Sequence, residues 1–210
     1  MNPALAAAIA GHLDAPLTDL RSRGQGFTRN WHARAGARPL FIKLSDDGDR
    51  LQAEADGLQA LAGCAALRVP QVLARGTAAE TSFLVLEWLD LSPRGEAARL
   101  GAALAALHRH RGPDYGWHRD NYLGANLQAN ERHSDWCTFF TRQRLTPQLE
   151  RALGQGYRPL AGPGWRVLEA VPHLLADHQP PPALLHGDLW HGNVAYVDGQ
   201  PCCFDPAVHF

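Results

Sequence analysis

The segment His186-Gly187-Asp188-Leu189-Trp190-His191-Gly192-Asn193 restricts what this chain can fold into more than any other part of it. It holds an Asp and an Asn five residues apart, within a short stretch that also contains two Gly residues. An aspartate in such a loop can accept a proton from a substrate hydroxyl, and an asparagine across the loop can turn its amide oxygen to a metal ion. The alternative is that Asp188 caps a turn and Asn193 ends a loop. The segment therefore predicts either a catalytic loop or an ordinary turn.

The same segment fits H-x-D-L-x-x-x-N, the catalytic-loop pattern of kinases. Phe204-Asp205-Pro206 follows at the distance where kinases carry a metal-binding Asp. Mg²⁺ takes hard oxygen ligands, with only one or two carboxylates beside phosphate oxygens. Asn193 and Asp205 are therefore candidate Mg²⁺ ligands. The alternative for Asp205 is an Asx turn before Pro206.

A Lys and a Glu in the N-terminal part fit the same interpretation. Leu40-Phe41-Ile42-Lys43 ends an apolar strand with a Lys, as the V-A-I-K strand of kinases does. Glu54 follows in a predicted helix and is placed to pair with Lys43 and orient it toward the α- and β-phosphates of ATP. The alternative is a Lys that snorkels at a strand end beside a solvated Glu.

Two further stretches are candidates for nucleotide binding. Residues 24–29 begin like G-x-G-x-x-G, with Arg29 in place of the third Gly. Gly24 and Gly26 could present backbone N–H groups to phosphate, or could form an ordinary hairpin turn. Glu87 and Leu89 follow an apolar strand, where backbone groups could bind an adenine edge whatever the side chains are. The alternative for this stretch is a simple linker.

Hydrophobic periodicity divides the chain into a β-rich and a mainly helical part. It predicts helices at 3–13, 50–62, 95–108, 135–153 and 166–177, and strands at 30–35, 39–44, 69–73 and 82–88. Residues 23–30 and 111–134 are predicted as a turn and a loop. Asp198-Gly199 predicts a hairpin between 193–197 and 201–204. We therefore expect one domain at 1–90 and a second at 91–210, joined near residues 88–93, with a ligand cleft between them.

Composition excludes several classes of protein. The 210 residues are 45% hydrophobic and 20% charged, as in folded globular proteins, and the net charge of −1 gives no sign of nucleic-acid binding. The four Cys have no C-x-x-C spacing and are predicted to be buried thiols of a reducing compartment. The 11 His lack the H-E-x-x-H zinc spacing. No apolar run is long enough for a membrane span and no basic leader is present, so we expect a cytoplasmic protein without a membrane partner.

Taken together, these motifs resemble the protein-kinase-like superfamily on its small-molecule branch. Gly187 replaces the Arg of H-R-D, as in aminoglycoside and choline kinases. More narrowly, the chain resembles the fructosamine kinase (ketosamine-3-kinase) family over essentially its whole length. The segments that carry this resemblance are 185–190, 192–193, 204–208, 120–124 and 135–145, the last with a distinctive D-W-x-x-F-F pattern.

The resemblance implies an α+β, two-lobed protein-kinase-like fold with a β-rich N-lobe and a mainly helical C-lobe. It implies an ATP- and Mg²⁺-dependent kinase that phosphorylates the sugar 3-hydroxyl of a fructosamine or ribulosamine, on a free amino acid or a glycated protein. The adduct then breaks down and releases the amine, which is deglycation repair. The implied base is Asp188, the implied Mg²⁺ ligands are Asn193 and Asp205, and the implied ATP-binding residues are Lys43 and Glu54. The implied substrate residues are Trp190, Asp120, Asn121 and Trp136.

The family continues with further helices after its D-P-A motif, whereas this chain ends at Phe210. We therefore expect a truncated C-lobe, whose uncovered apolar surface would favour self-association. Two alternatives to an active ketoamine kinase stay open at this point. One is a truncated, nucleotide-binding pseudokinase, and the other is a related kinase acting on an aminoglycoside, choline or another hydroxyl.

Overall fold

The computed structural model describes all residues 1–210. The chain forms two compact units. The first unit combines Met1–Leu107 with His186–Ala207, and the second combines His108–Leu185 with Val208–Phe210. The segment with the H-G-D pattern therefore belongs to the same unit as the N-terminal strands. The predicted domain boundary near residue 90 stays a prediction.

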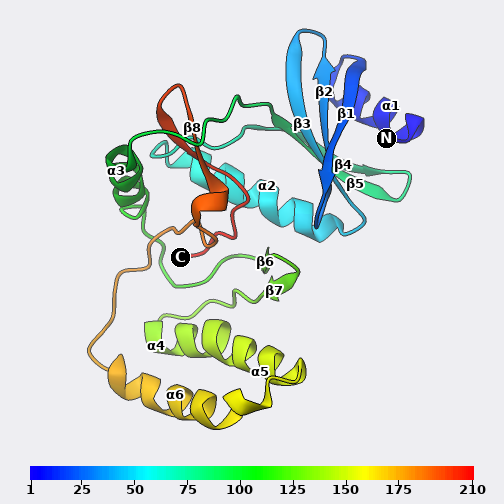
Figure 1. The fold of residues 1–210 in the computed structure, drawn as a ribbon. Coiled ribbons are helices and arrows are strands. Elements are labelled where there is room, and N and C mark those ends of the chain that lie inside the picture. The colour runs from blue at the N-terminus through cyan, green and yellow to red at the C-terminus, as the bar shows by residue number, and fades with distance from the viewer. The chain divides into compact units, whose positions relative to one another are not determined.

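The first unit contains a five-stranded antiparallel sheet with the strand order β1-β2-β3-β5-β4 (Figure 1). Its strands are β1 (Leu17–Gln25), β2 (Arg29–Ala35), β3 (Arg38–Ser45), β4 (Val72–Ala78) and β5 (Thr81–Glu87). The predictions for β2, β3 and β5 are confirmed. β4 begins later than expected, and β1 was not expected at all. Nearly every residue of β1 is exposed, so this edge strand lacks the apolar alternation by which a strand is recognised.

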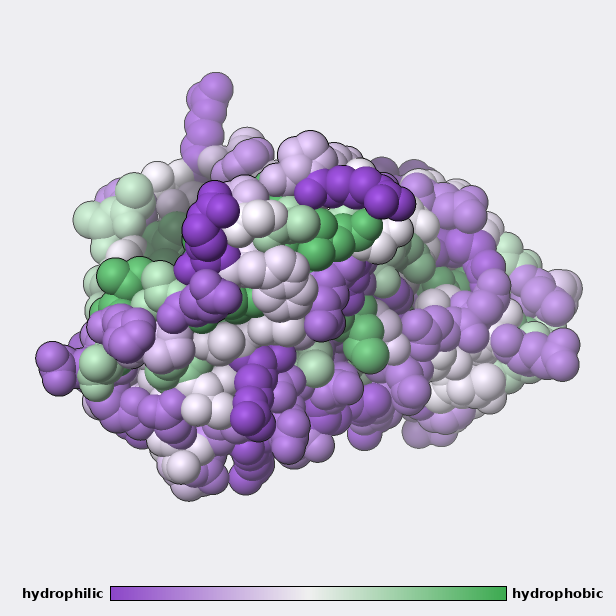
Figure 2. All heavy atoms as spheres, turned by 90° about the horizontal axis from the view of Figure 1, so that it is seen from below, coloured by the Kyte–Doolittle hydropathy of each residue, from purple (hydrophilic) through white to green (hydrophobic).

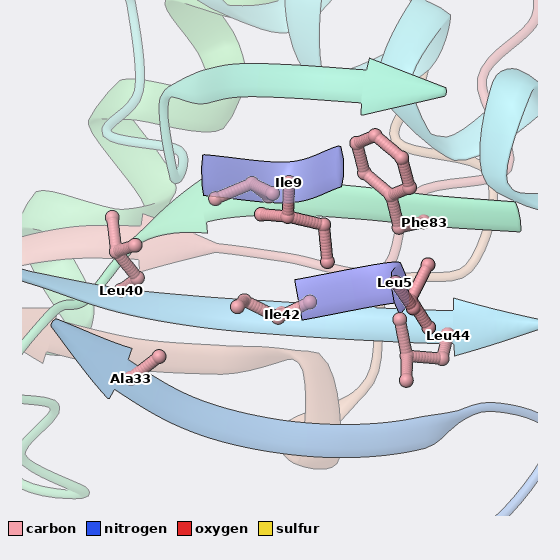
Figure 3. Close-up of a cluster of buried hydrophobic side chains, with 8 residues drawn as sticks. Leu5, Ile9, Ala33, Leu40, Ile42, Leu44 and Phe83 are labelled. Atoms are coloured by element: carbon pink, nitrogen blue, oxygen red, sulfur yellow. The ribbon is translucent and has the colours of Figure 1, made fainter. Parts of the chain in front are cut away.

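Helix α1 (Pro3–Leu13) covers one face of this sheet. Asn2 caps it by accepting a hydrogen bond from the Ala4 N–H at 2.9 Å, and Pro3 occupies its first turn. Leu5 and Ile9 lie one turn apart and are buried against the sheet. Figure 3 shows both side chains among those that the sheet contributes to this core, which are Ala33, Leu40, Ile42, Leu44, Phe83 and Val85.

Helix α2 (Gly48–Gly63) packs on β3, β4 and β5. Asp47 caps it through the Arg50 N–H at 3.3 Å, and its apolar stripe includes the buried Leu51 and Leu58. Because side chains alternate along a strand, Lys43 lies on the face of β3 opposite to Ile42 and the α1 core. This alternation directs Lys43 toward α2.

The first unit is completed by α3 (Ala97–Leu107) and by a hairpin of β8 (Val194–Val197) and β9 (Gln200–Cys203). Asp198 and Gly199 form the hairpin turn, with φ angles of +50° and +75°. Two successive positive φ angles are what a type I′ turn requires. The predicted Asp-Gly hairpin is therefore confirmed, and it places the residues before β8 beside those after β9.

The second unit contains β6 (Asn121–Leu123), β7 (Asn126–Gln128), α4 (Trp136–Phe139), α5 (Thr146–Gly154) and α6 (Ala161–Leu174). A small hairpin thus occupies part of the predicted loop. The predicted helix at 135–153 is present, but residues Phe140–Leu145 wind as a π-helix between α4 and α5. Helix α6 begins earlier than expected, and Pro163 is tolerated in its first turn because the N–H groups there have no partner within the helix.

No helix of the structure combines the length and apolar character needed to cross a bilayer. Figure 2 shows one face of the molecule, which is largely hydrophilic with small hydrophobic patches between hydrophilic side chains. The four cysteines are free thiols, but the prediction that all four are buried is wrong for Cys64 and Cys137, which are partly exposed. Cys202 and Cys203 are buried in β9, and burial raises their pKa to about 11 and about 12.

Candidate active site

The open end of the β8–β9 hairpin brings the two candidate metal ligands together. The Phe204 N–H donates to the Asn193 carbonyl at 3.2 Å, so Asp205 lies one residue beyond this bond. Asp205 has a φ of +56°, an uncommon conformation for a residue other than Gly, and its side chain is 51% exposed. Such backbone conformations concentrate at functional sites.

Asn193 is buried and fixed by Asp188. Its amide nitrogen donates to the Asp188 carbonyl at 2.8 Å and to Asp188 Oδ2 at 3.1 Å. These bonds set the orientation of the amide, and its oxygen accepts no hydrogen bond from the protein. The other carboxylate oxygen of Asp188, Oδ1, accepts no hydrogen bond from Asn193. The pair thus presents one amide oxygen and one carboxylate oxygen to a ligand.

His186 connects the loop that carries Asp188 to the segment that carries Asp205. Its ring Nδ1 faces the Asp188 N–H at 3.4 Å, and its Nε2 lies 3.1 Å from the Phe204 carbonyl. A backbone N–H can only donate and a carbonyl can only accept, so the ring carries its proton on Nε2. His186 is almost fully buried, and this burial lowers its pKa. The sequence favours a His186 that supports this loop by hydrogen bonding, and the two bonds confirm that role and extend it to the Phe204 carbonyl.

Gly187 lies against the backbone of the residue that follows Asp205 and Pro206. The Ala207 N–H donates to the His186 carbonyl at 2.9 Å. A Cβ on Gly187 would lie 1.8 Å from the Ala207 carbonyl oxygen, and the φ of Gly187 is +81°. Only glycine satisfies both conditions. This close approach explains why a Gly stands where protein kinases carry the Arg of H-R-D.

Lys43 forms ion pairs with both candidate carboxylates. Its Nζ lies 2.6 Å from Glu54 Oε1 and 2.5 Å from Asp205 Oδ1. The Lys43 and Glu54 side chains are only 8% and 12% exposed. Burial alone would lower the pKa of Lys43, but the two carboxylates outweigh it and raise this pKa. Lys43 is therefore a fixed cation between α2 and the end of the β8–β9 hairpin.

The residues at this end of the hairpin suit a magnesium ion. Asp205 offers an exposed carboxylate, and Asn193 offers an amide oxygen without a protein donor. Both are hard oxygen ligands, and Mg²⁺ in phosphoryl-transfer sites takes few protein ligands because phosphate oxygens supply others. No group of three His, Cys, Asp or Glu side chains lies close enough to hold a metal without such help. This donor set suits a metal that arrives with a nucleotide.

The glycine-containing turn between β1 and β2 borders a cavity. Gly26, Phe27 and Arg29 line it together with Leu44 and Ser45, the residues that follow Lys43, and its volume is about 340 Å³. A Cβ on Gly24 or Gly26 would meet nothing within 4 Å, so the turn is open to a ligand. Arg29, which replaces the third Gly of the motif, pairs with Asp46 at 2.8 Å.

The remaining predicted residues of the first unit lie elsewhere in it. Glu87 ends β5, and Leu89 follows it. Trp190 is 53% exposed. Its indole lies over Gly192, where a Cβ would come within 2.4 Å of the ring. The exposed indole is available to a ligand, and a side chain at position 192 would displace it.

The other predicted substrate residues belong to the second unit. Asn121 is buried, and both ends of its amide are hydrogen-bonded, since it donates to the Val208 carbonyl and accepts from the Gln128 amide, both at 2.8 Å. Asp120 accepts a hydrogen bond from the Asn130 N–H at 2.9 Å. Trp136 stacks on Phe140 with ring centroids 5.3 Å apart. These contacts give Asn121, Asp120 and Trp136 a structural role within the second unit. The substrate-binding roles of the three residues stay predictions.

Lowering the pH is expected to destabilise the protein through His186. An unfolded His has a pKa of about 6.5, and the folded pKa is lower, so the unfolded state binds more protons between the two values. The contribution of the neutral ring to the free energy of unfolding is complete above about pH 6.5 and is lost as the pH falls below it. Urea unfolding at pH 7.5 and 5.5 should show a smaller acid-induced loss for His186→Gln than for the wild type. Equal losses in both proteins would contradict this role.

Comparison with known proteins agrees with this geometry. A model of the fructosamine kinase family matches residues 5–210. A protein named probable ketoamine kinase from Klebsiella aerogenes is 39% identical over 207 residues, which is 95% of this chain and 71% of that protein. A crystal structure from Haemophilus somnus 129PT, assigned as a fructosamine-3-kinase, superimposes with a TM-score of 0.87 at 26% identity, covering 98% of this chain and 72% of that one.

A more distant neighbour supports the fold alone. An aminoglycoside phosphotransferase, solved in a ternary complex with ADP and hygromycin B, has a TM-score of 0.71 at 13% identity. The alignment covers 98% of this chain and 72% of that protein. The expected kinase-like α+β fold is thereby confirmed. With the family match over residues 5–210, the chain belongs to the fructosamine kinase family of phosphotransferase enzymes.

Proposed function

We propose that this enzyme uses ATP and Mg²⁺ to phosphorylate the sugar 3-hydroxyl of a ketoamine such as a fructosamine or a ribulosamine. The observation that carries the proposal is the arrangement of Lys43, Asp188, Asn193 and Asp205 in one compact unit. The supporting comparison is the family to which the chain belongs.

Asp188 is the group that activates the acceptor. Its Oδ2 is held by the Asn193 amide, which leaves Oδ1 to accept the hydroxyl proton of the sugar. As that proton moves to Asp188, the sugar oxygen forms a bond to the γ-phosphorus and the bond from this phosphorus to ADP breaks. The Asn193 hydrogen bonds hold the carboxylate in place, so that the substrate does not have to organise it.

Lys43 supplies positive charge for the phosphates. Glu54 anchors its Nζ from α2, so the ammonium is fixed before nucleotide binds. Asn193 and Asp205 are the residues that would hold Mg²⁺, which neutralises charge on the β- and γ-phosphates when bound. Their backbones are joined through Phe204, so both are positioned by the same hairpin.

Trp190 is the proposed wall of the sugar site. An exposed indole offers a flat apolar surface to the C–H face of a sugar ring, with a polar N–H at its edge. Phosphorylation at the 3-hydroxyl provides a phosphate as a leaving group beside the carbonyl carbon of the ketoamine. Loss of that phosphate and release of the amine would complete a deglycation reaction.

The test is ADP formation from Mg²⁺ and ATP with four acceptors: a synthetic ribulosamine, a synthetic fructosamine, choline and an aminoglycoside. We expect turnover with at least one ketoamine, no turnover with choline or the aminoglycoside, and none when EDTA removes Mg²⁺. Nucleotide binding without turnover on either ketoamine would contradict the proposal in favour of a pseudokinase. Turnover confined to choline or the aminoglycoside would assign the enzyme to another acceptor.

A further inference from the structure

Glu87 ends β5 with an unusual exchange of hydrogen bonds. Its N–H donates to the Gln71 carbonyl at 3.0 Å. In a regular antiparallel pair the Gln71 N–H would return a bond to the Glu87 carbonyl. Here the Gln71 N–H instead donates to the Glu87 side chain, at Oε1, over 2.6 Å. The carboxylate of Glu87 thus replaces its own backbone carbonyl in the ladder.

The neighbouring strand on the other side does not use this carbonyl either. Leu40 of β3 faces Glu87 across the sheet, and the Trp88 N–H donates to the Pro39 carbonyl at 3.3 Å. This register makes Leu40 and Glu87 a non-hydrogen-bonded pair. The Glu87 carbonyl therefore receives a backbone donor from neither neighbour. Two residues further on, the Leu89 N–H also donates to no backbone group.

The Glu87 carboxylate is held in this position by Arg68. The Arg68 guanidinium lies 2.7 Å from Glu87 Oε2, and the Glu87 side chain is 17% exposed. The backbone of Arg68 is itself fixed, because its carbonyl accepts the Cys203 N–H of β9 at 2.9 Å. Charge-assisted bonds of this kind are short and strong. Both carboxylate oxygens of Glu87 are thus committed within the protein.

We infer that Glu87 is a positioning residue for nucleobase recognition, because its carboxylate takes the Gln71 N–H and leaves the Glu87 carbonyl open to a donor on the ligand. The inference rests on the proposed ATP-dependent function. A free acceptor at Glu87 and a free donor at Leu89 match the adenine edge, which has a 6-amino donor beside the N1 acceptor. They do not match hypoxanthine, the base of inosine triphosphate, which has a 6-oxo acceptor beside an N1–H donor. The identity of the Glu87 side chain therefore matters, contrary to our expectation from the sequence.

The test compares the Kd of ATP with that of inosine triphosphate by titration calorimetry with Mg²⁺. The wild type is expected to favour ATP by about tenfold or more, which corresponds to about 1.4 kcal/mol. In Glu87→Leu the Gln71 N–H has no carboxylate partner and is expected to bond the Glu87 carbonyl. The preference for ATP should then fall to about twofold, a loss of roughly the worth of one hydrogen bond. Glu87→Gln, whose amide oxygen still accepts from Gln71, should keep most of the preference.

A second change separates positioning from simple destabilisation. Proline at position 71 has no N–H, so the double variant Gln71→Pro/Glu87→Leu leaves nothing to occupy the carbonyl, and the preference for ATP should return. Glu87→Ala gives the same comparison if Glu87→Leu does not fold. An unchanged preference in Glu87→Leu, or equal weakening of both nucleotides, would overturn the inference and leave the proposed function intact. A wild-type protein that binds neither nucleotide would instead contradict the proposed function.

Discussion

Replacing Asp188 with Asn is expected to lower kcat by roughly 10²–10⁴-fold, the usual contribution of a positioned general base. The amide has almost the same shape as the carboxylate and can still accept the hydrogen bond from Asn193, but it cannot take the hydroxyl proton. The Kd for ADP should change by less than about threefold, since Asp188 is assigned to the acceptor and not to the nucleotide. Steady-state kinetics with a ketoamine and a direct ADP titration measure the two effects separately.

Asp198→Asn provides the matched control for this variant. It makes the same chemical change in the hairpin that follows the loop of Asp188, at an exposed turn residue with a φ of +50°. Asn adopts this backbone region readily, so kcat should stay close to the wild-type value. A kcat in Asp188→Asn within threefold of that control would remove Asp188 from the chemistry.

Gly187→Ala is expected to be the most destabilising single-methyl change in this loop. The added Cβ would lie 1.8 Å from the Ala207 carbonyl oxygen, so the backbone of one segment must move. We expect a loss of about 4 kcal/mol or more in the free energy of unfolding, as for other severe backbone clashes. Movement at this contact would also separate His186 from Ala207 and displace Asp188, so kcat should fall together with stability.

Gly199→Ala is the control variant, because it introduces the strain of a side chain at a positive φ without a steric clash. Gly199 has a similar φ of +75°, but an added Cβ there would meet nothing within 4 Å. Its cost should be about 1–2 kcal/mol, the penalty for a left-handed L-residue. Urea unfolding of both variants measures the difference. Equal losses would show that the contact between Gly187 and Ala207 does not constrain the loop.

Local sequence signals were sufficient to predict the strand, helix and hairpin that carry the proposed catalytic residues. The apolar run before Lys43, the helix around Glu54 and the Asp-Gly turn of the hairpin each follow from residue type and spacing. The ion pair of Lys43 with Glu54 could be expected because the motifs occur in kinase order, but the ion pair of Lys43 with Asp205 was not expected. The contact between Lys43 and Asp205 could not be predicted from any one segment, because the two residues are 162 positions apart in the sequence.

Other features depend on tertiary contacts that leave no local pattern. Strand β1 is an exposed edge strand without alternating apolar residues. It is a strand because its backbone pairs with β2, which the local sequence does not show. The requirement for Gly187 depends on a carbonyl twenty residues later. The hydrogen bonds of Glu87 depend on Gln71 and Arg68, which belong to no recognisable motif. A Gly in the H-G-D pattern was visible, but nothing in the sequence showed what lies against it.

We propose that this enzyme transfers the γ-phosphate of ATP to the 3-hydroxyl of a ketoamine, and the structure of the product tests this reaction most directly. The wild-type protein is incubated with Mg²⁺, ATP and a synthetic fructosamine, and the reaction is followed by ³¹P NMR with correlation to the sugar protons. We expect a phosphate monoester whose phosphorus couples to the proton on carbon 3, formed in a one-to-one ratio with ADP. An ester on another hydroxyl, or ADP accompanied only by inorganic phosphate and intact fructosamine, would contradict it.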